Sequence, residues 1–143
     1  MLKRKANAIW EGDLKSGKGA LSVESGLFTG KYSFGTQFEQ EAGTNPEELI
    51  GAALAGCFSM ALSGDLARAG YKPEEIRTEA AVSLEKGEGG FAITKIVLET
   101  QAIVPEISMD EFAELASGAK KNCPVSKALK AVDIQLQAHL KKG

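Results

Sequence analysis

The segment from Leu49 to Gly64 carries no charged side chain, and this run constrains the fold more than any other feature. Helix signals surround it. Asn45 suits an N-cap, Pro46 suits the first helical position, and Glu48 completes a capping box with Asn45. Gly70 suits a C-terminal stop. These signals predict one helix over residues 45–69. Because that helix would be apolar on all sides, we expect it to be buried in a core.

Small residues recur every four positions along this helix, at Gly51, Ala55, Ser59 and Ser63. Such a stripe lets a second backbone approach closely, as when two helices cross. A single small chain offers limited surface with which to cover an apolar helix. We therefore expect an obligate homodimer in which two copies of the helix cross through their stripes. The alternative is a monomer whose sheet wraps around the helix.

The rest of the chain shows strand and helix patterns in turn. Apolar patterning predicts strands over residues 6–11, 19–24, 31–38, 76–86 and 91–104, and strict alternation predicts a half-buried strand over 132–140. Capping signals predict helices from Ser108 to about Asn122 and over 124–130. The sequence thus predicts one α+β domain over residues 1–143, with antiparallel sheets packed on buried central helices.

Charge and hydropathy exclude several classes of partner. The chain has 17 basic and 19 acidic residues, and they are interspersed rather than gathered into a basic stripe. We therefore expect no nucleic-acid partner. The N-terminus lacks the apolar segment of a signal peptide, and the run over 49–62 is shorter than a bilayer requires. We expect no membrane span and a cytoplasmic location, where thiols are kept reduced.

Cys57 and Cys123 are the only cysteines, and the chain has one histidine. Such a set cannot easily build a metal site, but it can form one dithiol/disulfide couple. Thiol redox chemistry is therefore the leading functional prediction, without a metal, flavin or nucleotide cofactor. The two cysteines lie far apart in the sequence, which does not by itself show whether their sulfurs meet.

Local sequence favours Cys123 as the attacking thiolate. It precedes Pro124 at a predicted helix N-terminus, and Lys120, Lys121 and Lys127 are near in sequence. Cys57 has apolar helical neighbours, and burial among such residues raises the pKa of a thiol. The alternative readings are that Cys57 is a small core residue and that Cys123 only caps a turn.

Several segments resemble one known family. The segment Gly43–Leu62 resembles the signature of the osmotically inducible protein C (OsmC) family, and Asn122–Ser126 is similar to its second cysteine motif. Trp10–Asp13, Glu24–Gly26 and Phe91–Ile96 resemble the OsmC branch rather than the sister organic hydroperoxide resistance branch. The resemblance covers essentially the whole chain.

The resemblance implies an intertwined homodimer of thiol peroxidases with two active sites at the subunit interface. It implies that Cys57 forms a sulfenate with an organic hydroperoxide, or less well with hydrogen peroxide, which reverses the local assignment. Cys123 would then resolve the sulfenate to a Cys57–Cys123 disulfide. The implied reductant is a dithiol, such as a lipoyl-bearing protein. The alternatives are a low-turnover peroxide-sensing or binding module of the same fold and a structural dimer with inert cysteines.

The resemblance also implies a catalytic glutamate, which Glu47 matches. Ten residues of straight helix span about 15 Å, so either the helix bends or Glu47 serves Cys57 of the other subunit. Gln37 stands where the OsmC branch usually has arginine, so it can donate a hydrogen bond but carries no charge. Lys15 or Lys18 could supply a substitute cation. Read without the resemblance, Glu47 is a first-turn helix carboxylate and the lysines are solvated turn charges.

Overall fold

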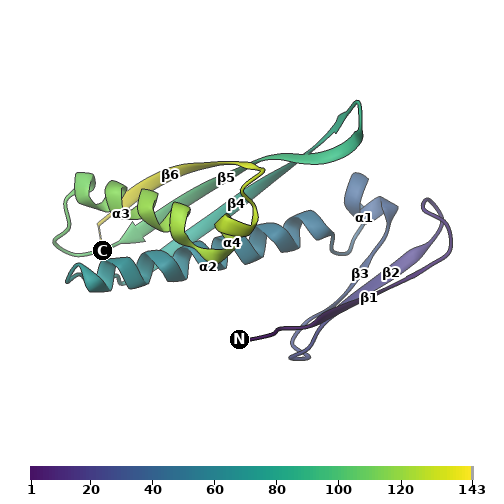
Figure 1. The fold of residues 1–143 in the computed structure, drawn as a ribbon, viewed down its shortest axis with the longest axis horizontal. Helices are drawn as coiled ribbons and strands as arrows, with labels where there is room; N and C mark the ends of the chain where they lie inside the picture. The colour runs from purple at the N-terminus through teal and green to yellow at the C-terminus, as the bar shows by residue number, and fades with distance from the viewer. Residues whose placement is uncertain (143) are drawn as a thin grey trace. The chain divides into compact units, whose positions relative to one another are not determined.

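The computed structural model describes residues 1–142, and the chain divides into two compact units, Met1–Leu49 and the residues from Ile50 onward. Its mixed helices and strands confirm the predicted α+β class. In chain order the elements are β1 (Ala6–Glu11), β2 (Lys18–Val23), β3 (Thr29–Tyr32), α1 (Phe34–Phe38), α2 (Pro46–Arg68), β4 (Glu75–Gly87), β5 (Gly90–Ile103), α3 (Met109–Asn122), α4 (Pro124–Ala128) and β6 (Asp133–Lys141) (Figure 1).

The first unit contains an antiparallel sheet in the order β1-β2-β3. Trp10 and Tyr32 pack against each other with ring centroids 5.4 Å apart. Gly19 lies between them in the register, and a Cβ there would come within 2.5 Å of the Tyr32 ring. The absence of a side chain at this position therefore allows the two rings to meet.

The strand predicted over residues 31–38 is wrong in its second half. Strand β3 ends at Tyr32, and α1 follows immediately. The Ser33 hydroxyl accepts a hydrogen bond from the Thr36 N–H, and Thr36 Oγ1 accepts one from the Ser33 N–H at 2.7 Å. This reciprocal capping box satisfies two backbone donors and starts a helix where the side-chain pattern indicated a strand.

Helix α2 begins and ends close to the predicted residues. Asn45 Oδ1 accepts a hydrogen bond from the Glu48 N–H at 2.8 Å, as expected of an N-cap. The Glu48 carboxylate does not close the predicted capping box, because it accepts a hydrogen bond from the Thr44 hydroxyl at 2.7 Å. Gly70, with φ +93°, lies just beyond the helix in the conformation that favours glycine.

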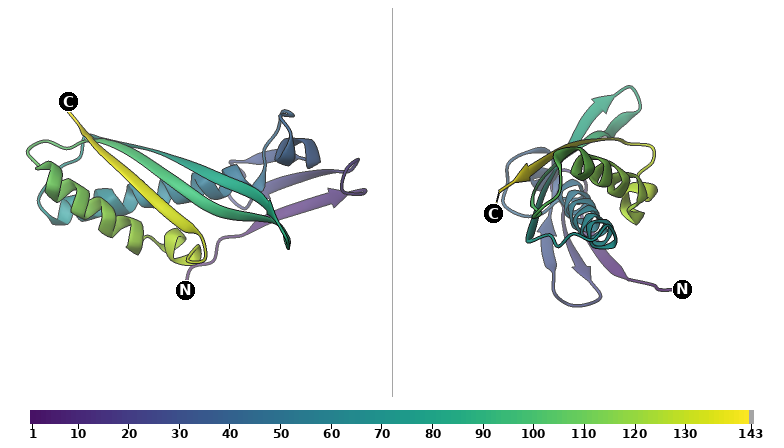
Figure 2. Two further views of the ribbon diagram at one scale, coloured as in Figure 1. Left: turned by 90° about the horizontal axis from the view of Figure 1, so that it is seen from above. Right: turned by 90° about the vertical axis from the view of Figure 1, so that its left-hand side faces the viewer.

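The second unit is a sheet in the order β4-β5-β6, and α2 and α3 lie side by side against one of its faces (Figures 1 and 2). Strands β4 and β5 are antiparallel, whereas β5 and β6 are parallel, so the prediction of antiparallel strands is wrong for β6. A parallel pair needs a long crossover connection, and α3 and α4 provide it here. The alternating burial predicted for the last strand is confirmed in β6.

Helix α2 is not covered on all sides within one chain, contrary to the expectation from its composition. Its fully buried face packs into the core through Leu54, Phe58, Leu62 and Leu66. The opposite face is exposed, and its residues include Ala52, Ala53, Gly56 and Met60. At 23 residues, α2 is by length and composition long and apolar enough to cross a membrane, although its buried face serves this protein's own core.

Two positions of the small-residue stripe pack against the sheet rather than against a second helix. A Cβ at Gly51 would lie 3.2 Å from Val82 of β4. The Ser59 hydroxyl lies 2.7 Å from the Thr78 hydroxyl of the same strand. At these two positions the small residues therefore let α2 approach strand β4 closely. The exposed face of α2 is a different face of the helix.

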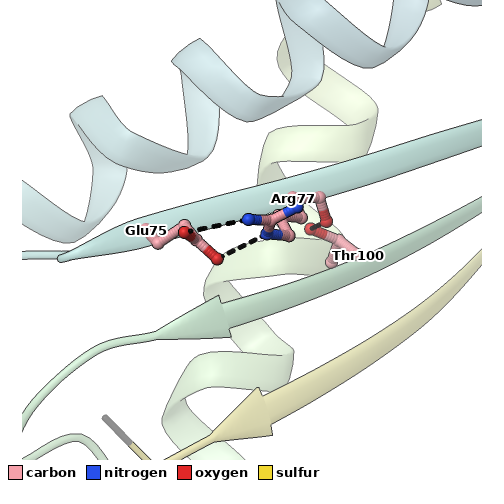
Figure 3. A network of polar contacts seen from close by, with 3 residues as sticks. All are labelled: Glu75, Arg77 and Thr100. Carbon is pink, nitrogen blue, oxygen red and sulfur yellow. Dashed lines mark hydrogen bonds and ion pairs between the residues drawn. The ribbon is translucent and has the colours of Figure 1, made fainter.

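A chain of hydroxyl groups joins α2 to strands β4 and β5. Thr100 donates its hydroxyl proton to the Arg77 carbonyl at 3.1 Å (Figure 3). Because a hydroxyl has one proton, Thr100 must accept from Thr78 at 2.9 Å, and Thr78 must accept from Ser59. The Arg77 guanidinium meanwhile pairs with Glu75, with Nε and Oε1 2.6 Å apart. The hydroxyl chain thus links α2 to the sheet through Ser59.

Candidate functional site

The structure brings the two cysteines together. Cys57 lies on α2 and is half-buried, and Cys123 lies between α3 and α4 and is fully buried. Both are free thiols, and a hydrogen bond between the two side chains contributes to the pKa of each. Packing of α2 against the α3–α4 junction therefore forms the dithiol that the sequence could not demonstrate.

Cys123 is held by the first turn of α4. Its Sγ accepts a hydrogen bond from the Ser126 N–H at 3.3 Å, and in the thiol form it donates one to Ser126 Oγ at 3.2 Å. Burial by itself would raise the pKa of Cys123. Hydrogen bonds from Ser126, Cys57 and the Val125 N–H outweigh burial, so the pKa of this thiol lies below its ordinary value.

The environment of Cys57 has the opposite effect. Burial raises the pKa of the Cys57 thiol, the Val125 N–H opposes this only in part, and the neighbouring Cys123 raises it further. Within one chain the more acidic thiol is therefore Cys123, in agreement with the local sequence argument. Lys120, Lys121 and Lys127 are not among the causes of the lower pKa of Cys123. The Lys120 ammonium donates instead to the Ile134 carbonyl of β6 at 3.1 Å.

Gln37 and Glu47, both in the first unit, form a hydrogen-bonded pair. Gln37 Nε2 donates to Glu47 Oε2 over 3.1 Å. The other carboxylate oxygen, Oε1 of Glu47, is buried, and within residues 1–142 it has no hydrogen-bond partner. The Gln37 amide thus donates a hydrogen bond to one oxygen of the carboxylate and leaves the second oxygen able to accept a hydrogen bond from another donor.

Lys15 and Lys18 are both exposed. Lys15 lies in the β1–β2 turn, where Asp13 accepts a hydrogen bond from the Ser16 N–H at 2.7 Å. Lys18 lies opposite Glu11 in the register of β1 and β2. In the described part of the chain no hydrogen bond or ion pair joins the side chain of either lysine to another residue, so a role as substitute cation stays a prediction.

Ser126 was not identified from the sequence as a member of the site. The sequence did contain a signal for it. Ser126 is the third residue after the predicted cap Cys123, and an N-cap side chain accepts a hydrogen bond from the backbone N–H at that position.

Among the described residues, no three His, Cys, Asp or Glu side chains are grouped as a metal ion would require.

Comparison with known proteins gives a consistent result. The model of the OsmC family, described as "OsmC-like protein", matches residues 38–137. The chain is 53% identical over 141 residues to "Peroxiredoxin OsmC" of Escherichia coli (strain K12), covering 98% of each chain. It is 34% identical over 96 residues to "Organic hydroperoxide resistance protein" of Xanthomonas axonopodis pv. citri, covering 66% of each. The crystal structure of the organic hydroperoxide resistance protein OhrB of Bacillus subtilis superposes with a TM-score of 0.69 at 26% identity, covering 96% of this chain and 98% of that one.

Proposed function

Since this chain belongs to the OsmC family, we propose that it is a cysteine-based peroxidase that reduces organic hydroperoxides, and hydrogen peroxide less well. The observation that carries the proposal is the Cys57–Cys123 thiol pair, in a chain 53% identical to a peroxiredoxin along nearly its whole length. The proposal treats residues 1–143 as one OsmC-like domain.

The proposed reaction has three steps. The Cys57 thiolate attacks the distal oxygen of the hydroperoxide, the O–O bond breaks, and the products are a Cys57 sulfenic acid and an alkoxide, which takes up a proton to give the alcohol. The Cys123 thiol then condenses with the sulfenic acid, releasing water and forming the disulfide. An external dithiol reduces that disulfide by exchange and is itself oxidised to a disulfide.

Cys57 is the proposed peroxidatic cysteine although Cys123 is the more acidic thiol in one chain. Cys57 is the more exposed of the two cysteines, so a hydroperoxide can reach it, and the stabilisation of its thiolate is assigned to groups outside the pair. We assign Glu47 to the site of the reacting Cys57 as the partner of a donor group there, with Gln37 orienting the Glu47 carboxylate through their hydrogen bond. Lys15 or Lys18 is the proposed substitute for the missing arginine charge.

The proposed assembly is a homodimer. The exposed apolar face of α2, which includes Ala52, Gly56 and Met60, supports it, because a soluble chain rarely leaves such a face open to water. In a dimer, Glu47 of one subunit can serve Cys57 of the other, although ten residues of straight helix would separate the two by about 15 Å within one chain. The proposed location is the cytoplasm, and the proposed reductant is a dithiol such as a lipoyl-bearing protein.

The test is consumption of cumene hydroperoxide and of hydrogen peroxide with a dithiol reductant, comparing the native protein with Cys57→Ser and Cys123→Ser. We expect many equivalents consumed per chain, loss of consumption in Cys57→Ser, and a sulfenic acid trapped in Cys123→Ser. The neutral Gln37 favours one rival, a low-turnover peroxide sensor. That rival consumes about one equivalent per chain, and such a result would replace the peroxidase assignment.

A further inference from the structure

The two residues of the Cys57–Cys123 pair differ in exposure within one chain. Cys57 is half-buried, whereas Cys123 is 0% exposed. In thiol–disulfide exchange the incoming thiolate must reach the sulfur that it attacks, and the other sulfur leaves with the electron pair of the broken bond. Access therefore favours attack on Cys57 and departure of Cys123.

The hydrogen bonds at the site favour the same direction. Ser126 contacts Cys123 twice, through its N–H at 3.3 Å and its hydroxyl at 3.2 Å. Ser126 is itself only 7% exposed, so water competes little for these bonds. The Val125 N–H interacts with both sulfurs, so Ser126 is the donor that distinguishes them. A sulfur that is better stabilised as a thiolate leaves faster.

We propose that the external dithiol attacks Cys57 Sγ and expels Cys123 as a thiolate held by Ser126, which makes Ser126 a positioning residue for the reductive step. The S–S bond between Cys57 and Cys123 breaks, and a mixed disulfide forms between Cys57 and the first sulfur of the reductant. The second thiol of the reductant then attacks that reductant sulfur and releases the Cys57 thiolate. The dithiol ends as a disulfide, and the protein disulfide ends as two thiols.

The first test maps the mixed disulfide in the native protein. The inference rests on the proposed function only for the origin of the disulfide, so diamide replaces peroxide as the oxidant. The oxidised protein is mixed briefly with excess 2-mercaptoethanol, quenched with acid and alkylated with N-ethylmaleimide. Mass spectrometry of its peptides then identifies the group on each cysteine. We expect mercaptoethanol on Cys57 and maleimide on Cys123. Equal labelling, mercaptoethanol mainly on Cys123, or no disulfide with diamide would overturn the inference.

The second test measures the rate at which dithiothreitol reduces the disulfide. We expect Ser126→Ala to lower this rate constant about three- to tenfold, because one of the two hydrogen bonds from Ser126 to the leaving thiolate is lost. Ser59→Ala is the matched control, since Ser59 bonds to Thr78 and not to either sulfur. An unchanged rate in Ser126→Ala, or an equal loss in both variants, contradicts the proposal. A protein that passes both tests but does not turn over peroxide would refute only the peroxidase assignment.

Discussion

Gln37 donates a hydrogen bond from Nε2 to Oε2 of Glu47 over 3.1 Å, and the neighbouring oxygen Oε1 is buried without a partner in the described chain. A buried acceptor without a donor costs about 1–3 kcal/mol. The amide meets only one oxygen of the carboxylate, whereas the planar fork of an arginine can engage both oxygens at once. The side chain at position 37 therefore decides how firmly Glu47 is held.

Replacing Gln37 by arginine should strengthen this arrangement. In Gln37→Arg we expect the free energy of unfolding to rise by about 1 kcal/mol, because Oε1 of Glu47 gains a charged donor. We also expect kcat/KM for cumene hydroperoxide to rise several-fold, because the added charge stabilises a thiolate. Urea unfolding and steady-state kinetics measure the two effects. Gln37→Met, which removes the hydrogen bond without adding charge, should lower both quantities, and equal behaviour of the two variants would contradict the role given to position 37.

The two thiols should make the stability of the protein depend on pH in opposite directions. The pKa of Cys123 is lower in the folded protein than its ordinary value of 9.0. Its contribution to stability is therefore complete above that value and is lost as the pH falls through the folded pKa. The pKa of Cys57 is raised, so its contribution is complete below the ordinary value and is lost as the pH rises through the folded pKa.

Single-cysteine variants separate the two contributions. Relative to the variant lacking both thiols, Cys57→Ser, which keeps Cys123, should gain stability as the pH rises from neutral towards 9.0. Cys123→Ser, which keeps Cys57, should lose stability as the pH rises above 9.0. Urea unfolding at a series of pH values measures both trends. Parallel curves for the two single variants would show that the environments of the thiols do not differ as described.

The hydroxyl chain on the sheet should matter for stability. Thr100 is fully buried, accepts from Thr78 and donates to the Arg77 carbonyl. Thr100→Val keeps the shape of the side chain but leaves the Thr78 hydroxyl without its acceptor, so we expect a loss of about 1–3 kcal/mol in urea unfolding. Thr94→Val on the same strand is the control, because Thr94 is bonded only to the exposed Glu85 side chain. A loss of the same size in both variants would show that the chain of hydroxyl groups adds nothing to the free energy of unfolding beyond the effect of strand propensity.

Most of the fold follows from local patterns, and the exceptions have physical causes. The caps at Asn45 and Ser108 mark helix starts that the structure confirms, because capping is local. The apolar residues of the segment 34–38 suit either a strand or a helix, and the reciprocal hydrogen bonds between Ser33 and Thr36 favour the helix. The parallel direction of β6 depends on the crossover through α3 and α4, which a single strand does not encode.

The candidate site was predictable in its residues but not in its geometry. Cys57 and Cys123 stand out as the only cysteines, yet their meeting depends on helix packing that no local pattern reveals. The Gln37–Glu47 bond likewise needs α1, which the sequence did not predict. The lower pKa of Cys123 agrees with its position before Pro124, because Val125 and Ser126, which supply most of the hydrogen bonds that lower it, are among the next three residues.

The exposed face of α2 gives the sharpest test of the proposed dimer. Met60 is 74% exposed in one chain, so Met60→Lys should leave the fold of that chain intact. In a dimer that buries this face, each new ammonium would lie desolvated and unpaired, at a cost of several kcal/mol. We expect Met60→Lys to sediment as a monomer and to lose most of its peroxidase activity, because Glu47 of one subunit no longer reaches Cys57 of the other.

Met109→Lys, at a 47% exposed position on α3, is the control and should keep both assembly and activity. A Met60→Lys protein that stays dimeric would place the subunit interface elsewhere, and a fully active monomer would remove the need for Glu47 of a partner.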